Sequence, residues 1–112
     1  MAWKWGIIFA GFAVMLGAFG AHGLESAMPN ADLSPWKTAV TYQMWHALAL
    51  LAIGLHPKQP RLPALLFVFG ILIFSGSLYT LVLTQTMWLG AITPIGGASL
   101  IAGWVALLYT SR

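Results

Sequence analysis

Three polar residues could carry chemistry inside an otherwise apolar stretch: Tyr42, Gln43 and His46. In a helix, residues three and four positions apart lie on the same face, so these side chains are expected to point the same way. A histidine in that place could bind a ligand, handle a proton, act as a general base, or hold a metal or haem. The plainer interpretation is a hydrogen bond to a neighbouring helix, with Ser75 or Tyr79 as the partner.

A second histidine, His22, closes the first apolar stretch in the segment "GAFGAHGL". At about 1.5 Å of rise per residue, His22 lies near the outer rim of a membrane and His46 about 10 Å deeper. One metal ion or one bis-histidine haem needs ligands much closer in depth. A relay of polar groups or one elongated amphiphilic ligand fits the spacing better. His22 is therefore either a helix-end residue or a partner at the mouth of a site, and Glu25 could pair with it or with Lys37.

Further polar positions fall in the same outer half of the apolar stretches. In "ITPIGG", Pro94 lacks a backbone donor and should leave the carbonyl of Gly90 without its helical partner. Backbone freed in this way is tolerated only where protein or a cavity satisfies it. The sequence thus predicts an inward-facing polar cluster that forms a cavity open to the non-cytoplasmic side. Its candidate members are His22, Trp36, Tyr42, Gln43, His46, Ser75, Tyr79, Thr93 and Pro94.

Several chemistries lack the residues that they need. The chain has no cysteine and only two acidic residues, which excludes disulfides, thiolate catalysis and carboxylate-rich metal sites. No serine has a histidine-plus-acid pattern around it, so no catalytic residue is assigned. The net charge of +3 comes from few charges and no basic patch, which argues against nucleic-acid binding. No metal site and no cofactor is predicted, although haem and a quinone stay open.

The elements that must position these residues are transmembrane helices. Of the 112 residues, 60% are hydrophobic and 6% are charged, and a water-soluble domain this small cannot hide so much apolar surface. About 20 apolar residues span the hydrocarbon core of a bilayer. We therefore predict an all-α membrane protein of one domain, residues 1–112, built as a bundle of four transmembrane helices. The spans are expected at about 5–21, 39–55, 62–83 and 87–108, with an outer loop at 22–38.

Shorter signals refine the ends of these spans. In "SPWKTAV", Ser34 has the pattern of an N-cap and Pro35 that of a first helical residue. Residues 56–63, with three prolines, predict a tight turn, and residues 84–86 a short hairpin.

The distribution of basic residues predicts the orientation. Both termini and the second connection share one side, which carries four basic residues against one on the other side. The positive-inside rule then places both termini in the cytoplasm, in a bacterial inner membrane. The four are Lys4, Lys58, Arg61 and Arg112, and the one is Lys37. The alternative is a cleaved signal peptide at the N-terminus, which would leave three spans.

Small residues recur every four positions on two of the expected helices. Such stripes let helix backbones approach closely within a membrane. We expect them to pack the helices within one chain, and the alternative is an interface of a homo-oligomer. The stripes are Ala13, Gly17 and Ala21 on the first helix, and Gly90, Pro94, Ala98, Ala102 and Ala106 on the last.

The segments "GAFGAHGL", "WKTAVTYQMWHALALL", "FSGSLY" and "ITPIGGASLIAGW" together resemble the family known as domain of unknown function 423. The resemblance covers essentially the whole chain, with the segments in the same order. It implies a small four-span membrane protein of bacterial origin, and it supplies no established activity and no catalytic residues.

Three functions remain in view from the sequence. The first is a non-enzymatic membrane protein whose outer cavity binds or passes an amphiphilic molecule, a solute or a proton. The second is a structural or assembly protein that acts through helix packing with itself or a larger complex. The third is an intramembrane enzyme with His46 as general base, for which no acid lies on the same helix face.

Overall fold

The computed structural model of the chain describes residues 1–110, and within them there is no β-strand. Four helical runs, Ala2–Ala27, Ser34–Leu55, Arg61–Thr84 and Met87–Thr110, are long and apolar enough to cross a membrane, as predicted. The 22 residues of the shortest run span roughly 33 Å, which matches a bilayer core of about 30 Å. The elements are α1 Ala2–Phe19, π-helix η1 Gly20–Leu24, α2 Glu25–Ala27, α3 Ser34–Leu55, α4 Arg61–Thr84, 3-10 helix η2 Met87–Ala91 and α5 Thr93–Thr110.

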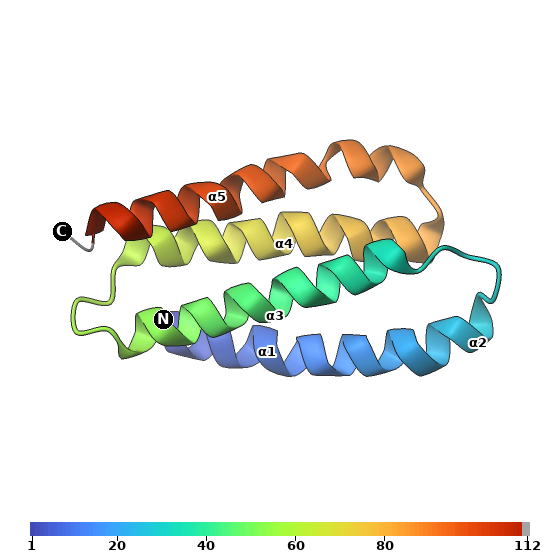
Figure 1. The fold of residues 1–112 in the computed structure, drawn as a ribbon, viewed down its shortest axis with the longest axis horizontal. Coiled ribbons are helices and arrows are strands. Elements are labelled where there is room, and N and C mark those ends of the chain that lie inside the picture. The colour runs from blue at the N-terminus through green and yellow to red at the C-terminus, as the bar shows by residue number, and fades with distance from the viewer. Residues whose placement is uncertain (111–112) are drawn as a thin grey trace.

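The helices form a flattened bundle, with the order α1, α3, α4, α5 across the face seen in Figure 1. The Cα trace measures 49 × 26 × 15 Å, so the bundle is thinner than it is wide. The main contacts pair α1 with α3, α4 with α5, and α3 with α4. The start of α1 and the end of α5 lie at the same end of the bundle (Figure 1). The predicted basic residue Arg112 lies outside the described residues.

The first helical run is longer than expected, because no loop begins at residue 22. The helix continues through η1 and α2, and only residues 28–33 separate it from α3. The indole Nε1 of Trp36 donates a hydrogen bond to the carbonyl of Leu16, 2.9 Å away, just before the π-helical turn. The backbone N–H of Gly20 also reaches this carbonyl, so the indole is an additional donor to the helix at this point. The helix therefore continues, in contact with Trp36, through a segment whose glycines and histidine had predicted a loop.

The start of α3 also differs in its detail. Ser34 is the first helical residue and Leu33 the N-cap, and no side chain of the N-cap closes the helix. Instead, Asp32 accepts a hydrogen bond from the backbone N–H of Ser34, 3.0 Å away. Pro35 occupies the first turn as predicted, where its missing N–H costs nothing.

Pro94 does not interrupt a helix, contrary to the prediction. The last span begins as the 3-10 helix η2 and becomes α-helical only at Thr93. Pro94 is thus the second residue of α5, a position where a missing backbone donor breaks no intrahelical bond. Gly90 itself lies in the 3-10 helix η2, so Pro94 takes no α-helical partner away from its carbonyl.

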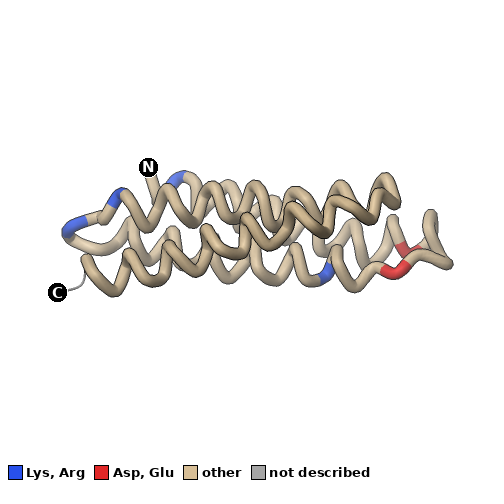
Figure 2. Tube along the Cα trace, turned by 90° about the horizontal axis from the view of Figure 1, so that it is seen from above, with Lys and Arg blue, Asp and Glu red and all other residues tan. Residues whose placement is uncertain are grey.

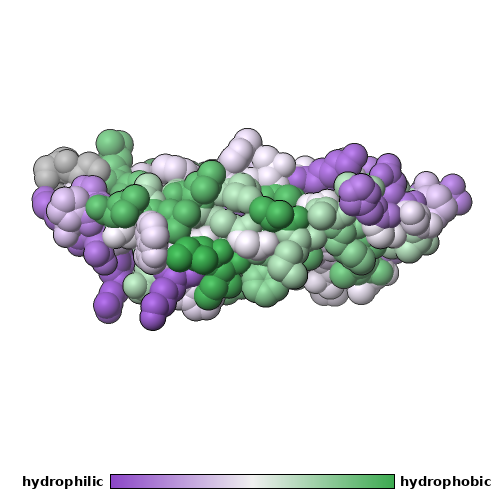
Figure 3. Space-filling model, turned by 90° about the horizontal axis from the view of Figure 1, so that it is seen from below, coloured by the Kyte–Doolittle hydropathy of each residue, from purple (hydrophilic) through white to green (hydrophobic). Residues whose placement is uncertain are grey.

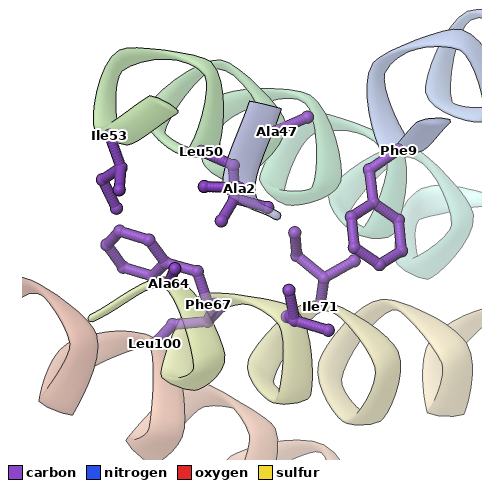
Figure 4. Packing of buried hydrophobic residues seen from close by; sticks show 10 residues of the cluster. Ala2, Phe9, Ala47, Leu50, Ile53, Ala64, Phe67, Ile71 and Leu100 are labelled. Carbon is purple, nitrogen blue, oxygen red and sulfur yellow. The ribbon is translucent and has the colours of Figure 1, made fainter. Parts of the chain in front are cut away.

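Two hydrophobic clusters fill the interior. The larger one joins residues of all four long helices near the end where the chain begins, and Figure 4 shows Phe9, Leu50, Phe67 and Leu100 turned toward one another. The smaller one lies at the opposite end, around Trp36 and Val82. Outside these clusters, large apolar side chains cover the middle of the face seen in Figure 3, and hydrophilic ones gather toward its two ends.

The predicted small-residue stripe on α5 does not pack within the chain. Gly90, Pro94, Ala98 and Ala102 are exposed and Ala106 is half-buried. The residues of α5 that are buried are Gly96, Leu100 and Gly103, one to two positions away around the helix. A Cβ built on Gly96 would collide with the backbone of Phe74, which shows how closely α4 and α5 approach.

The stripe on the first helix is half right. Ala13 is fully buried and Gly17 is half-buried against Val40, whereas Ala21 is exposed. The seam with α3 is continued instead by Gly20, where a Cβ would collide with the indole of Trp36. Ala13, Gly17, Gly20 and Leu24 are spaced by four, three and four residues, which is the ordinary spacing of one helix face.

Candidate functional site

Gln43 and Tyr79 form the centre of a buried network, together with the backbone of α1. The Gln43 side chain is 3% exposed, and its Nε2 donates to the carbonyl of Phe9, 2.8 Å away. The hydroxyl of Tyr79 donates to Oε1 of Gln43 at 2.7 Å. One side chain of α3 is thereby bonded to both α1 and α4. Both residues are among the nine predicted cluster members, but the sequence suggested Tyr79 as a partner of His46 and not of Gln43.

His46 is bonded to Trp104 and not to the expected Ser75 or Tyr79. Its Nδ1 lies 2.7 Å from the carbonyl oxygen of Tyr42, one turn earlier in α3, and the indole N–H of Trp104 in α5 donates to its Nε2 at 3.0 Å. The two bonds are compatible only with the neutral tautomer that carries its proton on Nδ1. Phe67 packs edge-on against the rings of both His46 and Trp104. We call Gln43, His46, Tyr79 and Trp104, with Ser75, the central network.

Ser75 is nearly inaccessible and donates to the carbonyl of Ala39, 2.8 Å away, which joins α4 to α3. Predicted cluster member Thr93 lies apart from it, on the α4–α5 seam, with its hydroxyl 2.6 Å from that of Ser77. Within residues 1–110, every buried side-chain nitrogen or oxygen has a hydrogen-bond partner. The buried polar groups therefore hold helices together, and none is left over for a solute.

The remaining predicted members lie on the surface. His22 is exposed in the π-helical turn, and Pro94 is exposed at the start of α5. Tyr42 is 36% exposed, and its ring packs on Trp45 and Phe74. The nine candidates thus form no single inward-facing cluster.

Trp36 links the central network to the surface. It is 2% exposed, and its ring contacts that of Tyr79 with centroids 4.7 Å apart. Its bond to Leu16 ties α3 to α1 at the end where the π-helical turn lies. Trp36 therefore packs against the interior on one side and lines a surface hollow on the other.

That hollow has a volume of about 200 Å³ and lies between α1 and α3. We call it the α1–α3 notch. Its floor consists of small residues of α1 and η1, Gly17, Gly20 and Ala21, and its α3 side includes Lys37. Its lining residues are Gly17, Gly20, Ala21, Leu33, Trp36, Lys37, Val40 and Thr41.

The charges of the described chain separate toward two ends, as Figure 2 shows. The basic end carries Lys4, Lys58 and Arg61. The acidic end carries Glu25 and Asp32, and Lys37 lies somewhat inward from them. The backbone N–H of Ser34 bonds to the carboxylate of Asp32 and holds its pKa below the usual value, so this group is charged at neutral pH.

A second, wider hollow lies on the outside of α4 and α5, with a volume of about 750 Å³. We call it the α4–α5 groove. Its lining residues are Leu62, Leu66, Ala98, Ile101, Ala102, Val105, Ala106, Tyr109 and Thr110. Three residues of the small-residue stripe on α5, Ala98, Ala102 and Ala106, line this groove. As for metals, residues 1–110 contain no group of three or more histidine or acidic side chains placed to hold an ion.

Sequence reasoning missed Trp104 and Lys37 as site residues. Trp104 had a signal, since an indole well inside a span needs an acceptor for its N–H. Ser99, which donates to the carbonyl of Leu66 at 2.8 Å, had a similar one. Lys37 had none, because its place beside a hollow depends on how α1 packs.

Comparison with known proteins places the chain among small bacterial membrane proteins. The pattern of a family described as "Protein of unknown function (DUF423)" matches residues 16–97. A UPF0382 membrane protein of Staphylococcus saprophyticus is 52% identical over 108 residues, which cover 92% of this chain and 89% of the relative. The UPF0382 membrane protein YwdK of Bacillus subtilis is 46% identical over 112 residues, 95% and 91% of the two chains. No solved structure matches the chain.

Proposed function

The chain belongs to the DUF423 family of membrane proteins, and from that premise we propose that it binds an amphiphilic molecule in the α1–α3 notch. The observation that carries the proposal is the composition of the notch. Apolar walls from Trp36 and Val40 lie next to a cationic group, Lys37, near one end of the bundle. An amphiphile needs an apolar surface for its hydrophobic part and a charged group at the edge of that surface for its headgroup.

The interior of the bundle does not favour passage of a solute, so the proposed activity is binding at the notch. Passage of a solute or proton through the bundle requires polar groups free to exchange partners. Gln43, His46, Ser75 and Tyr79 are each committed to bonds between or within helices. Both ring nitrogens of His46 are occupied, which also supports a non-enzymatic role without a cofactor.

The proposed orientation puts the basic end in the cytoplasm. Three of the four basic residues described lie there, against Lys37 near the acidic end, and positively charged residues are retained on the cytoplasmic side of bacterial membranes. The notch then opens toward the outer leaflet of the cytoplasmic membrane. Cysteine variants at Lys58 and Asn30, labelled in intact cells with a membrane-impermeant maleimide, test this: only the variant at Asn30 should react.

Filling the notch tests the binding proposal. A leucine at Gly17 projects toward Val40, because a Cβ there already lies 3.3 Å from its Cγ1. The matched control is Gly11→Leu, where a Cβ meets nothing within 4 Å. Full-length protein purified in mild detergent is incubated with an equimolar mixture of phosphatidylethanolamine and phosphatidylglycerol with identical acyl chains. Native mass spectrometry then counts the retained lipids.

Wild type and Gly11→Leu should retain one more lipid than Gly17→Leu. Equal retention by all three proteins would overturn the proposal. Far-ultraviolet circular dichroism of the variants serves to separate a lost site from a lost fold.

A second candidate function is assembly through helix packing at the α4–α5 groove. It is favoured by Ala98 and Ala102, which are exposed, line the groove and are small enough for another helix to approach. Ala102→Leu should then abolish self-association in liposomes, measured by single-molecule photobleaching. Ile95→Leu, an exposed change on α5 outside the groove, should leave it intact. A monomeric wild-type protein would refute a homo-oligomer.

A further inference from the structure

We propose that the amphiphile held at the α1–α3 notch is a phospholipid with a phosphoethanolamine headgroup, the phosphate at Lys37 and the amine at Asp32 and Glu25. This inference rests on the proposed function, because it names the chemical class of the molecule that the notch binds. The juxtaposition that carries it is the order of charges from the notch to the acidic end.

The order of groups along α3 matches the order of groups in such a lipid. Val40 supplies an apolar wall, and Lys37 comes next, in the first turn of the helix, with Trp36 beside it. Ser34, at the start of α3, lies about 4.5 Å further out along the axis, and Asp32 precedes it. A phospholipid runs from acyl chain to phosphate to amine in the same direction, with two carbon atoms between its opposite charges.

Lys37 is available to bind a phosphate. Within residues 1–110 its ammonium makes no ion pair, and it acts on the Asp32 carboxylate only as a weak influence through space. The nearby hydroxyl of Thr41 does not compete, because it donates to the backbone carbonyl of Lys37 at 2.9 Å. The ammonium therefore offers three donors to a ligand.

The carboxylates of the acidic end supply the partner for an amine. Asp32 is held at the start of α3 by its bond to Ser34, and this bond uses one of its two oxygens. Glu25 is exposed on α2, at the same end of the bundle. A primary ammonium can donate to both carboxylates, whereas a quaternary choline amine has no N–H to donate.

The balance of charge also selects against an anionic lipid. One positive and two negative side chains, Lys37 against Glu25 and Asp32, make the region negative overall. A phosphatidylglycerol headgroup would be attracted to Lys37, but its net negative charge would be repelled by the two carboxylates. A charge near a membrane surface changes lipid binding by about fivefold. The net preference for phosphatidylethanolamine is therefore expected to be about fivefold or more.

The experiment uses the same lipid mixture and reads the ratio of the two lipids, not the number bound. Wild type should retain phosphatidylethanolamine at least about fivefold over phosphatidylglycerol. The double variant Glu25→Gln, Asp32→Asn should reverse the preference, since only Lys37 then remains. Lys37→Gln should bind both lipids more weakly, and Lys58→Gln, at the basic end, should change nothing.

Each outcome decides between the two proposals. A wild-type ratio near one, or a ratio that the double variant leaves unchanged, overturns the headgroup assignment while the notch still binds lipid. Loss of the extra lipid only in Gly17→Leu, without any headgroup preference, supports amphiphile binding alone. Equal retention by wild type and Gly17→Leu overturns both.

Discussion

Replacing Gln43 by leucine removes one hydrogen bond between α3 and α1 and one between α3 and α4. Leucine keeps most of the volume of the buried side chain, so the main loss is polar. The hydroxyl of the half-buried Tyr79, which donates to Gln43 at 2.7 Å, is left without that partner. Hydrogen bonds between helices in membranes average about 0.6 kcal/mol, and an orphaned buried group costs roughly 1–3 kcal/mol. We expect Gln43→Leu to lower the free energy of unfolding by about 2 kcal/mol.

The pairing itself is measured by a double-mutant cycle. Tyr79→Phe alone should cost about 1 kcal/mol, because it leaves Oε1 of Gln43 without a donor. The double variant should cost about 2 kcal/mol and not the sum of about 3, since neither partner is then stranded. Unfolding of the full-length protein in mixed micelles with increasing dodecyl sulfate, followed by circular dichroism, supplies the three values. Thr80→Val, an exposed change whose hydroxyl bonds only within its own helix, is the control.

Strictly additive costs would refute the interpretation that the two side chains form one interhelical bond. A stabilised Gln43→Leu would go further. It would mean that Gln43 is retained for binding and not for the fold.

Further changes test other contacts. Gly96→Ala should destabilise the protein by roughly 2 kcal/mol in the same unfolding assay, because its new methyl group collides with backbone of α4, while Gly11→Ala should have no packing cost. Trp104→Phe keeps an aromatic ring but removes the donor to His46, so the nitrogen-15 resonance of Nε2 of His46 should shift; an unchanged resonance would refute the bond. The pKa of Asp32 is lowered in the folded protein, so its contribution is present at neutral pH and is lost as the pH falls below about 4. Asp32→Asn should flatten that part of the stability profile, and an unchanged profile would contradict a stabilising bond between Asp32 and Ser34.

The four spans could be predicted because the length of an apolar stretch shows directly whether it can cross the bilayer. A stretch of about 20 apolar residues has few alternatives once its backbone must be satisfied within the bilayer. A polar partner for the amide of Gln43 in an adjacent span was expected in general terms, but the sequence suggested Tyr79 for His46 and not for Gln43. The helix boundary near residue 22 could not be predicted, because the helix continues there in contact with Trp36, which comes 14 residues later in the chain.

The faces of the helices were harder to predict than the helices themselves. Small residues occur on both sides of α5, and the four-residue spacing of one set does not tell which side meets α4. Gly96 and Gly103 pack inside, and Ala98 and Ala102 face out. The partner of His46 was missed for the same reason: Trp104 lies 58 residues away, and only the packing of α5 brings it near.

The pairing of α1 with α3 and of α4 with α5 bears on how the protein is made. Each pair is a helical hairpin whose two members follow one another in translation, and the turn after Leu55 is the only covalent link between the hairpins. The first hairpin can therefore assemble in the bilayer before the second has left the ribosome. The α3–α4 seam, with its bonds from Ser75 and Tyr79, then closes last. Two separately expressed halves, divided within residues 56–60, should find one another in the membrane and rebuild the native contacts.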